Sequence, residues 1–338
     1  MAKLPKAGLL ALVEDAIRES GWNLLHVSKA KEHPAIYQIY RGAKRFRVRV
    51  YIWNLTHGGG KQRPAHEYRI QITGIEGPTG VLQFQPEIGG KTLILGWWDQ
   101  ADVFAGFDYD YHVGQLGASP SIQVGEAALH AAHANGFAPH NKGNGELAIA
   151  FRPDFISTYI DTLEALHECG ESSGEIQILD ELSSDPGSVD DAEIKGEVGE
   201  ARQYAVVTTK RALRDLDFRD RVLTAYGHKC AMCGVQLKLL DAAHILPVVH
   251  ADSTDETRNG VALCALHHRA YDRALVTFDE KFQVRSSAKV AANLKAAGHD
   301  GGFPGFMKAL RPLLILPPDK KDRPAASFVK VANTLRGW

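Results

Sequence analysis

The chain has 338 residues, of which 44% are hydrophobic and 23% are charged, an ordinary composition for a globular protein. This length suits two domains of roughly 150 residues each, and no apolar run approaches the roughly 18–20 residues that a membrane span needs. The first twenty residues carry acids within their apolar stretch and lack a small-residue cleavage site. We therefore expect an amphipathic helix rather than a signal peptide, and a cytoplasmic protein.

The net charge of −1 conceals an uneven distribution. Residues 168–200 hold eleven acidic side chains and one lysine, so this segment carries −10 and the rest of the chain carries +9. The segment is also rich in serine and glycine, which favours an acidic linker with at most a short strand at IQIL. We expect an N-terminal domain over 1–167, this linker, and a C-terminal domain over 201–338.

The N-terminal domain is predicted to contain both helices and strands. Helices are expected over 6–20 and 125–136, each ended by a glycine. Strands are expected over 45–53, 67–74, 92–99 and 146–151, the first two from strict alternation of apolar and polar residues. The fold class is therefore α+β, with a mixed α/β sheet domain whose sheet is polar on one face.

One face of the strand RFRVRVYIW (45–53) is strongly cationic. Three arginines and two aromatic residues alternate along it: Arg45, Arg47, Arg49, Tyr51 and Trp53. Cations follow phosphates and aromatic rings stack on bases, so this face is a candidate DNA-binding surface. The loop that follows adds Lys61 and Arg63, which suit the approach to a groove. The alternative interpretation is an ordinary solvated face.

Aromatic residues are dense in the span GWWDQADVFAGFDYDYH, residues 96–112. Four of them are candidates for a pocket that takes a flipped or modified base: Trp97, Trp98, Phe104 and Tyr109. The alternative is that these rings belong to the core of the domain.

Four side chains of the C-terminal domain have the spacing of a structural zinc site. Cys230 and Cys233 form a C-x2-C pair closed by Gly234, and a C-x2-H pair, Cys264 and His267, follows about thirty residues later. Two thiolates on a turn and a Cys/His pair at the start of a helix make a tetrahedral Cys3His set. The alternative is two unrelated buried cysteine pairs, because such spacings also recur by chance.

A second histidine, His268, follows His267 directly. Neighbouring residues on a helix point about 100° apart, so the two imidazoles serve different sites. His268 and Asp272 are spaced i, i+4 and share one helix face, where they can bind a catalytic divalent ion together. Further upstream, an apolar strand ends at His244 and a polar loop ends at Asn259.

The segments AAHILP and NGVALCALHHRAYD resemble the HNH (ββα-metal) endonuclease family. More narrowly, they resemble its restriction-type members with an AAHI-x-P strand and an NG-x-x-L-C-x-x-HH-x-x-x-D helix. The resemblance covers about a fifth of the chain, from about 215 to 280. It implies a zinc-stapled nuclease domain in which His244 is the general base and Asn259 and His268 complete the catalytic set. Asn259 would hold the loop that orients the base, or would bind the metal.

Phosphodiester hydrolysis needs a nucleophilic water and neutralisation of phosphate charge, which Mg²⁺ or Mn²⁺ supplies as a Lewis acid. In many family members the residue before the general base binds this ion, but here that residue is Ala243. Asp241 is the nearest acid, yet strand alternation sends it to the face opposite His244, so it reaches the ion only if the strand bends or bulges. Arg269 and Arg273 flank the helix, where they would contact phosphates or balance nearby acids.

The sequence leaves three functions open. The first is a DNA endonuclease of restriction or defence type, whose N-terminal domain recognises a sequence or a modified base in double-stranded DNA. The second is a nuclease gated by a small molecule that the N-terminal domain senses. The third is a non-catalytic, zinc-stapled DNA-binding protein, which Ala243 supports and the His244, Asn259 and His268 set opposes. Cutting both strands of a duplex needs two active sites, so we also expect a homodimer.

Overall fold

The computed structural model describes all residues except 1–2, 30, 58–65 and 76–79. The chain divides into two compact units, Met1–Arg214 and Asp215–Trp338. The division falls within helix α6 (Glu200–Ala225) rather than in the acidic segment. Among the described residues, no helix is both long enough and apolar enough to cross a bilayer.

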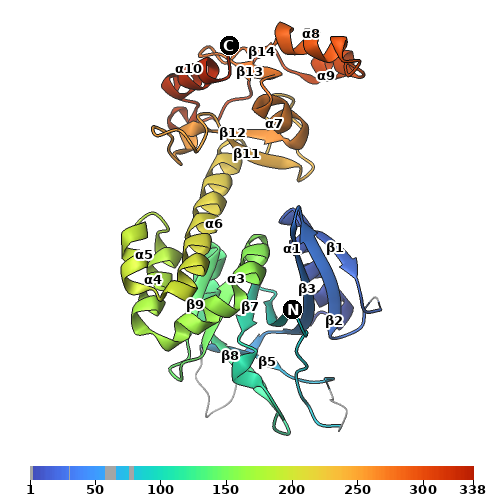
Figure 1. Ribbon diagram of the computed structural model, residues 1–338, viewed down its shortest axis with the longest axis vertical. Coiled ribbons are helices and arrows are strands. Elements are labelled where there is room, and N and C mark those ends of the chain that lie inside the picture. Colours follow the sequence, from blue (N-terminus) through green and yellow to red (C-terminus); the bar gives the residue numbers. More distant parts are fainter. Residues whose placement is uncertain (1–2, 30, 58–65, 76–79) are drawn as a thin grey trace. The chain divides into compact units, whose positions relative to one another are not determined.

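A seven-stranded sheet forms the centre of the first unit (Figure 1). Its spatial order is β1 (Asn23–His26), β2 (Ala35–Arg41), β3 (Lys44–Asn54), β6 (Lys91–Trp98), β7 (Val103–Phe107), β10 (Leu147–Phe151) and β9 (Phe137–Asn141). Strands β3 and β6 are parallel and the other neighbours are antiparallel. A second sheet consists of β4 (Thr56–His57), β5 (Glu67–Gln71) and β8 (Ser121–Gly125). The predicted strands are confirmed as β3, β5, β6 and β10, and the α+β class is confirmed.

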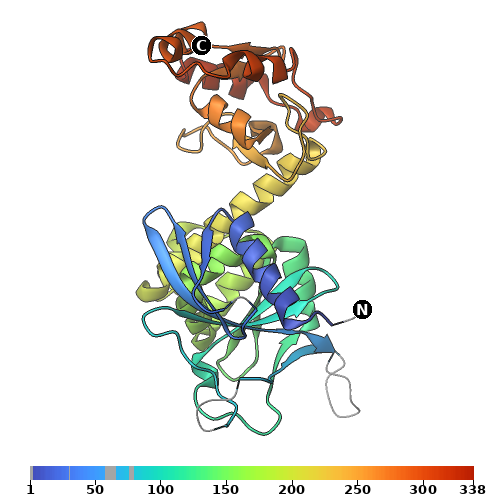
Figure 2. The same ribbon diagram turned by 90° about the vertical axis from the view of Figure 1, so that its right-hand side faces the viewer.

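Helices cover the sheet of the first unit. Helix α1 (Lys6–Glu19), dark blue in Figure 2, buries its apolar stripe against β1 and β3. Helix α2 (Glu126–Asn135) packs on β9 and β10, and α3 (Ile156–Glu168) packs on β10 and β6. Gly21 and Gly136 adopt left-handed φ values of 81° and 93° just after α1 and α2, so both predicted helix ends are confirmed.

Strand β3 has a polar face only over its first half. Arg45 and Arg47 are exposed, whereas Tyr51 and Trp53 are 1% and 5% exposed and stack with their ring centroids 6.3 Å apart. Both rings belong to a buried cluster that includes residues of the second sheet. The prediction that Tyr51 and Trp53 lie on an exposed DNA-binding face is therefore wrong, because alternation alone does not reveal what covers a face.

The acidic segment is folded rather than open. It contains α4 (Ser173–Ser184) and α5 (Asp191–Glu197), and both helices lie within the first unit (Figure 1). The IQIL stretch is part of α4, so the predicted strand is wrong. Leu179 and Leu182 are fully buried at helical spacing, and α4 packs on β9.

A buried ion pair joins this acidic segment to α6. Glu175 is 2% exposed and accepts hydrogen bonds from Arg202 Nε and Nη2 at 2.6 and 2.7 Å. The Gly199 amide donates to the same carboxylate at 3.0 Å. The segment is therefore held in place by both apolar burial and a charge-assisted contact.

The second unit is built around a short hairpin-like strand pair. Its strands and helices are β11 (Leu240–His244), β12 (Gly260–Cys264), α7 (Ala265–Asp272), β13 (Val276–Phe278), β14 (Val284–Ser286), α8 (Ala288–Ala296), α9 (Phe303–Ala309) and α10 (Ala326–Leu335). Strands β11 and β12 form one antiparallel pair and β13 and β14 another. Arg336, just after α10, donates to the Ile245 carbonyl at 2.9 Å, which anchors the C-terminal helix next to His244.

Candidate active site and metal centre

Strands β11 and β12 and helix α7 bring the predicted residues of the second unit together. His244 is opposite Gly260 in a regular register, and α7 begins directly after β12. A Cβ atom on Gly260 would lie 2.2 Å from Val222 Cγ2 of α6. Only glycine therefore lets α6 pack this closely against the strand pair.

The four predicted zinc ligands form one cluster. Their ligand atoms all lie within 4.8 Å of one another, and the His267 Nδ1 atom is 3.5 Å from Cys230 Sγ and 3.3 Å from Cys264 Sγ. Cys233 completes the set on a tight turn in which the Gly234 amide donates to the Cys230 carbonyl at 2.7 Å. The prediction is confirmed in that these four groups can hold a metal ion.

The surroundings of Cys230 favour a metal-binding thiolate. Burial disfavours the charged form of all three thiols and raises the pKa values of Cys233 and Cys264. At Cys230 a hydrogen bond with His267 and backbone amides of the cluster outweigh burial and lower the pKa to about 6. Two or more thiolates with one imidazole are the donor set that structural zinc prefers. The residues present therefore fit a structural Zn²⁺ ion.

His244 is held by two neighbours that the sequence did not reveal. Its Nε2 atom lies 3.1 Å from Asp255 Oδ1, and its ring stacks on Phe218 at 3.8 Å between centroids with 11° between planes. Arg221 of α6 donates to the Asp255 carbonyl at 2.7 Å and so fixes the loop that carries the carboxylate. These partners come from helix α6 and from the loop between β11 and β12, and no local spacing in the sequence pairs them with His244.

Asn259 is fully buried beneath the same loop. Its Oδ1 atom accepts from the Leu246 amide at 2.9 Å, and Nδ2 donates to the Thr254 carbonyl at 2.8 Å and to Ser253 Oγ at 3.2 Å. Asn259 thus links the two ends of the loop that begins after His244 and ends before Asp255.

Asp241, His268 and Asp272 lie together at the surface of α7. His268 Nδ1 is 3.2 Å from Asp241 Oδ2, and His268 Nε2 is 3.6 Å from Asp272 Oδ2. The two carboxylates are about half exposed, with side-chain exposures of 52% and 53%. Asp241 makes this contact with His268 from a strand whose register with β12 is regular, so the contact requires no bulge.

Contacts within this trio shift the pKa values of His268 and Asp241. The hydrogen bond with Asp241 is the main cause that raises the pKa of His268, and the charges of Asp272 and Asp241 add to it against the effect of burial. The same hydrogen bond lowers the pKa of Asp241. A divalent cation at this trio would compete with the proton on His268, because an imidazole binds a metal only in its neutral form.

The predicted DNA-contacting cations have different surroundings. Arg45, Arg47, Arg269 and Arg273 are exposed, whereas Arg49 is only partly exposed. Arg47 and Arg49 also pair with the buried carboxylate of Glu87. Lys61 and Arg63 lie outside the described residues.

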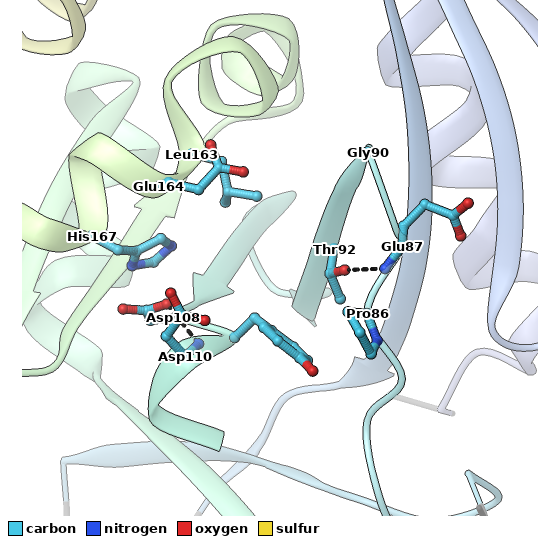
Figure 3. A pocket seen from close by; sticks show the side chains of 10 residues that line it. Pro86, Glu87, Gly90, Thr92, Asp108, Asp110, Leu163, Glu164 and His167 are labelled. Carbon is cyan, nitrogen blue, oxygen red and sulfur yellow. Dashed lines mark hydrogen bonds between the residues drawn. The ribbon is translucent and has the colours of Figure 1, made fainter. Parts of the chain in front are cut away.

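The four predicted pocket aromatics do not share a pocket. Trp97, Trp98 and Phe104 are at most 2% exposed and belong to the core, so this part of the prediction is wrong. Tyr109 lines a cavity of about 160 Å³. This cavity lies where β6 begins and β7 and α3 end, and Figure 3 shows Thr92, Asp108 and His167 around it.

Comparisons with known proteins identify two parts of the chain. Residues 46–160 match the family described as methylase-associated X1, and residues 230–279 match the HNH endonuclease family. One similar solved structure is a modification-dependent TagI restriction endonuclease, with 12% identity, a TM-score of 0.27, and coverage of 84% of this chain and 80% of that chain. A likeness of this size settles neither fold nor function. No curated protein matches.

The HNH match covers the four residues of the Cys3His cluster, His244 with Asp255, and the trio of Asp241, His268 and Asp272. The resemblance inferred from the sequence is therefore confirmed. Residues 230–279 form an HNH endonuclease domain, and the protein is a nuclease.

Proposed function

We propose that this chain is a metal-dependent DNA endonuclease of restriction or defence type that hydrolyses phosphodiester bonds in modified double-stranded DNA. His244 pairs with Asp255 near one end of a ββα element, and the helix of this element contributes His268 and Asp272. This pairing is the observation that carries the proposal. The methylase association of the family matched by residues 46–160 supports a substrate that carries a base modification.

His244 acts as the general base in this proposal. Asp255 accepts a hydrogen bond from the Nε2–H group, which leaves the Nδ1 lone pair to take a proton from water. Stacking on Phe218 fixes the plane of the ring, and Asn259 fixes the loop. Asn259 is thus a positioning residue rather than a metal ligand.

Asp241, His268 and Asp272 would hold the catalytic Mg²⁺ or Mn²⁺ ion, with Asp241 in place of the ligand missing at Ala243. Carboxylate oxygens suit these ions, and an imidazole is compatible with Mn²⁺. When bound, the ion supplies Lewis-acid neutralisation of the phosphate and of the leaving oxygen. The Cys3His cluster would hold the structural Zn²⁺.

The first unit supplies target recognition. Arg45 and Arg47, together with Arg269 and Arg273 of the second unit, would contact phosphates. A homodimer would supply the two active sites that a double-strand cut needs, and the enzyme would meet its DNA in the cytoplasm.

Cleavage of methylated and unmethylated plasmid by the full-length protein tests the proposal. We expect cutting with Mg²⁺ or Mn²⁺ that is lost in His244→Ala and kept in His299→Ala, an exposed histidine of the same unit. Equal cutting of both plasmids would refute modification dependence. A folded, metal-loaded protein that cuts neither would refute the catalytic assignment and favour a DNA-binding scaffold.

A further inference from the structure

The cavity beside Tyr109 is rich in hydrogen-bond acceptors. Asp108 and Asp110, after β7, and Glu164, in the last turns of α3, contribute carboxylates (Figure 3). Lys91 Nζ donates to the Glu164 carboxylate, so the two aspartates supply the remaining acceptors, and Leu163 adds apolar surface. The C-terminal end of a helix also carries partial negative charge. This lining repels phosphate and suits a ligand that presents N–H donors. A volume of about 160 Å³ is below the ~300–1,000 Å³ of pockets for drug-sized ligands, so the ligand is small.

The floor of the cavity is fixed. The His167 ring is 2% exposed; its Nδ1 atom donates to the Leu147 carbonyl at 2.6 Å, and its Nε2 atom lies 2.9 Å from the Tyr159 hydroxyl. Burial lowers the pKa of His167, so the ring is a neutral wall. Both nitrogens of His167 already have hydrogen-bond partners, so the carboxylates and Tyr109 determine which ligand the cavity binds.

A rigid turn forms another wall and carries an exposed apolar tip. The Gly90 amide donates to the Glu87 carbonyl at 3.0 Å, which closes a turn with Ile88 and Gly89 at its centre. Gly89 has a φ of 69°, the left-handed value that the second central position of a type II turn requires. Thr92 Oγ1 accepts from the Glu87 amide at 2.8 Å, and Ile88 is 91% exposed.

The cationic strand β3 holds this turn in place. The Glu87 side chain is 5% exposed and pairs with Arg47 and Arg49, with Arg49 Nη2 at 3.0 Å from Oε2. A Cβ on Gly90 would lie 2.3 Å from the Arg47 carbonyl oxygen, so the turn is packed directly on the strand. A single exposed apolar residue is ordinary. Ile88 differs because a fixed turn presents it next to a small cavity and a cationic face.

We propose that this cavity takes a single nucleobase extruded from double-stranded DNA and that Ile88 enters the duplex in its place. The base is one with an exocyclic amino group, such as cytosine or adenine or a methylated form of either, because carboxylates accept from that group and Tyr109 offers a ring to lie against. An apolar wedge offsets part of the cost of unstacking. Arg45, exposed on the same strand, supplies charge for the flanking phosphates. The inference rests on the proposed function, because it takes DNA as the substrate.

Extrusion is measured on the full-length protein carrying His244→Ala, so that the DNA stays intact. The probes are short duplexes with one 5-methylcytosine, one N6-methyladenine or no modification, each with 2-aminopurine next to the site. The fluorescence of 2-aminopurine rises when its neighbour leaves the stack. We expect a rise with at least one modified probe.

Two added substitutions test the two parts of the site. Ile88→Ala should weaken binding of that probe by about tenfold or more and remove the fluorescence rise. Asp108→Asn, which keeps an acceptor for the Asp110 amide, should weaken binding and reduce the preference for the modified probe. Leu25→Ala, a 55% exposed apolar residue of the same unit, should change neither quantity.

Equal affinity of the Ile88→Ala and Leu25→Ala proteins, or binding without a fluorescence rise, would overturn the proposal. Tight binding of free nucleoside monophosphates that exceeds binding of every duplex would also overturn it and assign the cavity to a small ligand. These outcomes are independent of cleavage. A protein that extrudes a base but never cuts refutes only the catalytic proposal, and one that cuts modified DNA without extrusion refutes only the inference about the cavity.

Discussion

Replacing Asn259 separates its two candidate roles, positioning the active-site loop and binding the catalytic metal. The side chain is fully buried, and Asn259→Ala removes the partners of the Leu246 amide and the Thr254 carbonyl. Each buried group left without a partner costs about 1–3 kcal/mol. Because water reaches part of the loop, we expect a loss of about 2–4 kcal/mol in the free energy of unfolding of the second unit.

The catalytic effect should exceed this stability effect. The loop that Asn259 ties together has His244 before one end and Asp255 after the other, so loosening it displaces both members of the pair. A misplacement of about 1 Å costs about 100-fold in rate. We therefore expect kcat for plasmid nicking to fall by about 100-fold in Asn259→Ala, under conditions where the protein is still folded.

Asn259→Asp makes the test decisive. The carboxylate keeps an acceptor for the Leu246 amide but loses the donors to Thr254 and Ser253, so a positioning role predicts a kcat as low as in Asn259→Ala. A metal-ligand role predicts instead that the aspartate retains activity and half-saturates at the same or a lower Mg²⁺ concentration. The assay is kcat against Mg²⁺ concentration, with the exposed Asn293→Ala as the control. Full activity of Asn259→Asp would refute the positioning argument.

Two further predictions concern the metal centre and the acidic segment. Cys233→Ser should lower the zinc content measured by emission spectroscopy and the thermal midpoint of the second unit, and an unchanged midpoint in a zinc-free protein would contradict the structural role of the ion. For Glu175, hydrogen bonds from Arg202 and Gly199 outweigh the effect of burial and hold its pKa below the ordinary value of 4.5. Its contribution to stability is therefore complete above about pH 4.5 and is lost as the pH falls through the lowered pKa. Glu175→Gln should flatten the dependence of the urea midpoint on pH in this acid range, and Glu193→Gln, at an exposed acid of the same segment, should not; parallel curves for the wild type and Glu175→Gln would refute the argument.

The spacing of residues along the sequence predicted those parts of the site that lie on one short turn or helix. The Cys230–Cys233 pair and the Cys264–His267 pair each lie on one local element, and only their meeting depends on the fold. The separation of His267 from His268 follows from helical geometry alone. These features are accessible to sequence analysis because neighbouring residues on regular structure have fixed relative directions.

The remaining features depend on contacts between distant segments. Asp255 is eleven residues from His244 across an irregular loop, and Phe218 belongs to a helix that precedes the whole domain core. The alternation of apolar and polar residues in β3 identified the two faces of this strand, but it did not reveal the second sheet that buries Tyr51 and Trp53. In the acidic segment, composition suggested an open linker, although buried leucines at helical spacing were present.

The length of α7 would give the two proposed metal ions different roles. The helix has eight residues and no side-chain cap at its start, whereas isolated helices shorter than about 12–15 residues are marginal in water. Its first turn is attached to the Cys3His cluster, and its later residues provide His268 and Asp272. The proposed zinc ion would thus be acquired during folding and the proposed Mg²⁺ ion at each catalytic cycle. Removal of Mg²⁺ would be reversed by adding it back, whereas a cell short of zinc would make a chain that no supply of Mg²⁺ could activate.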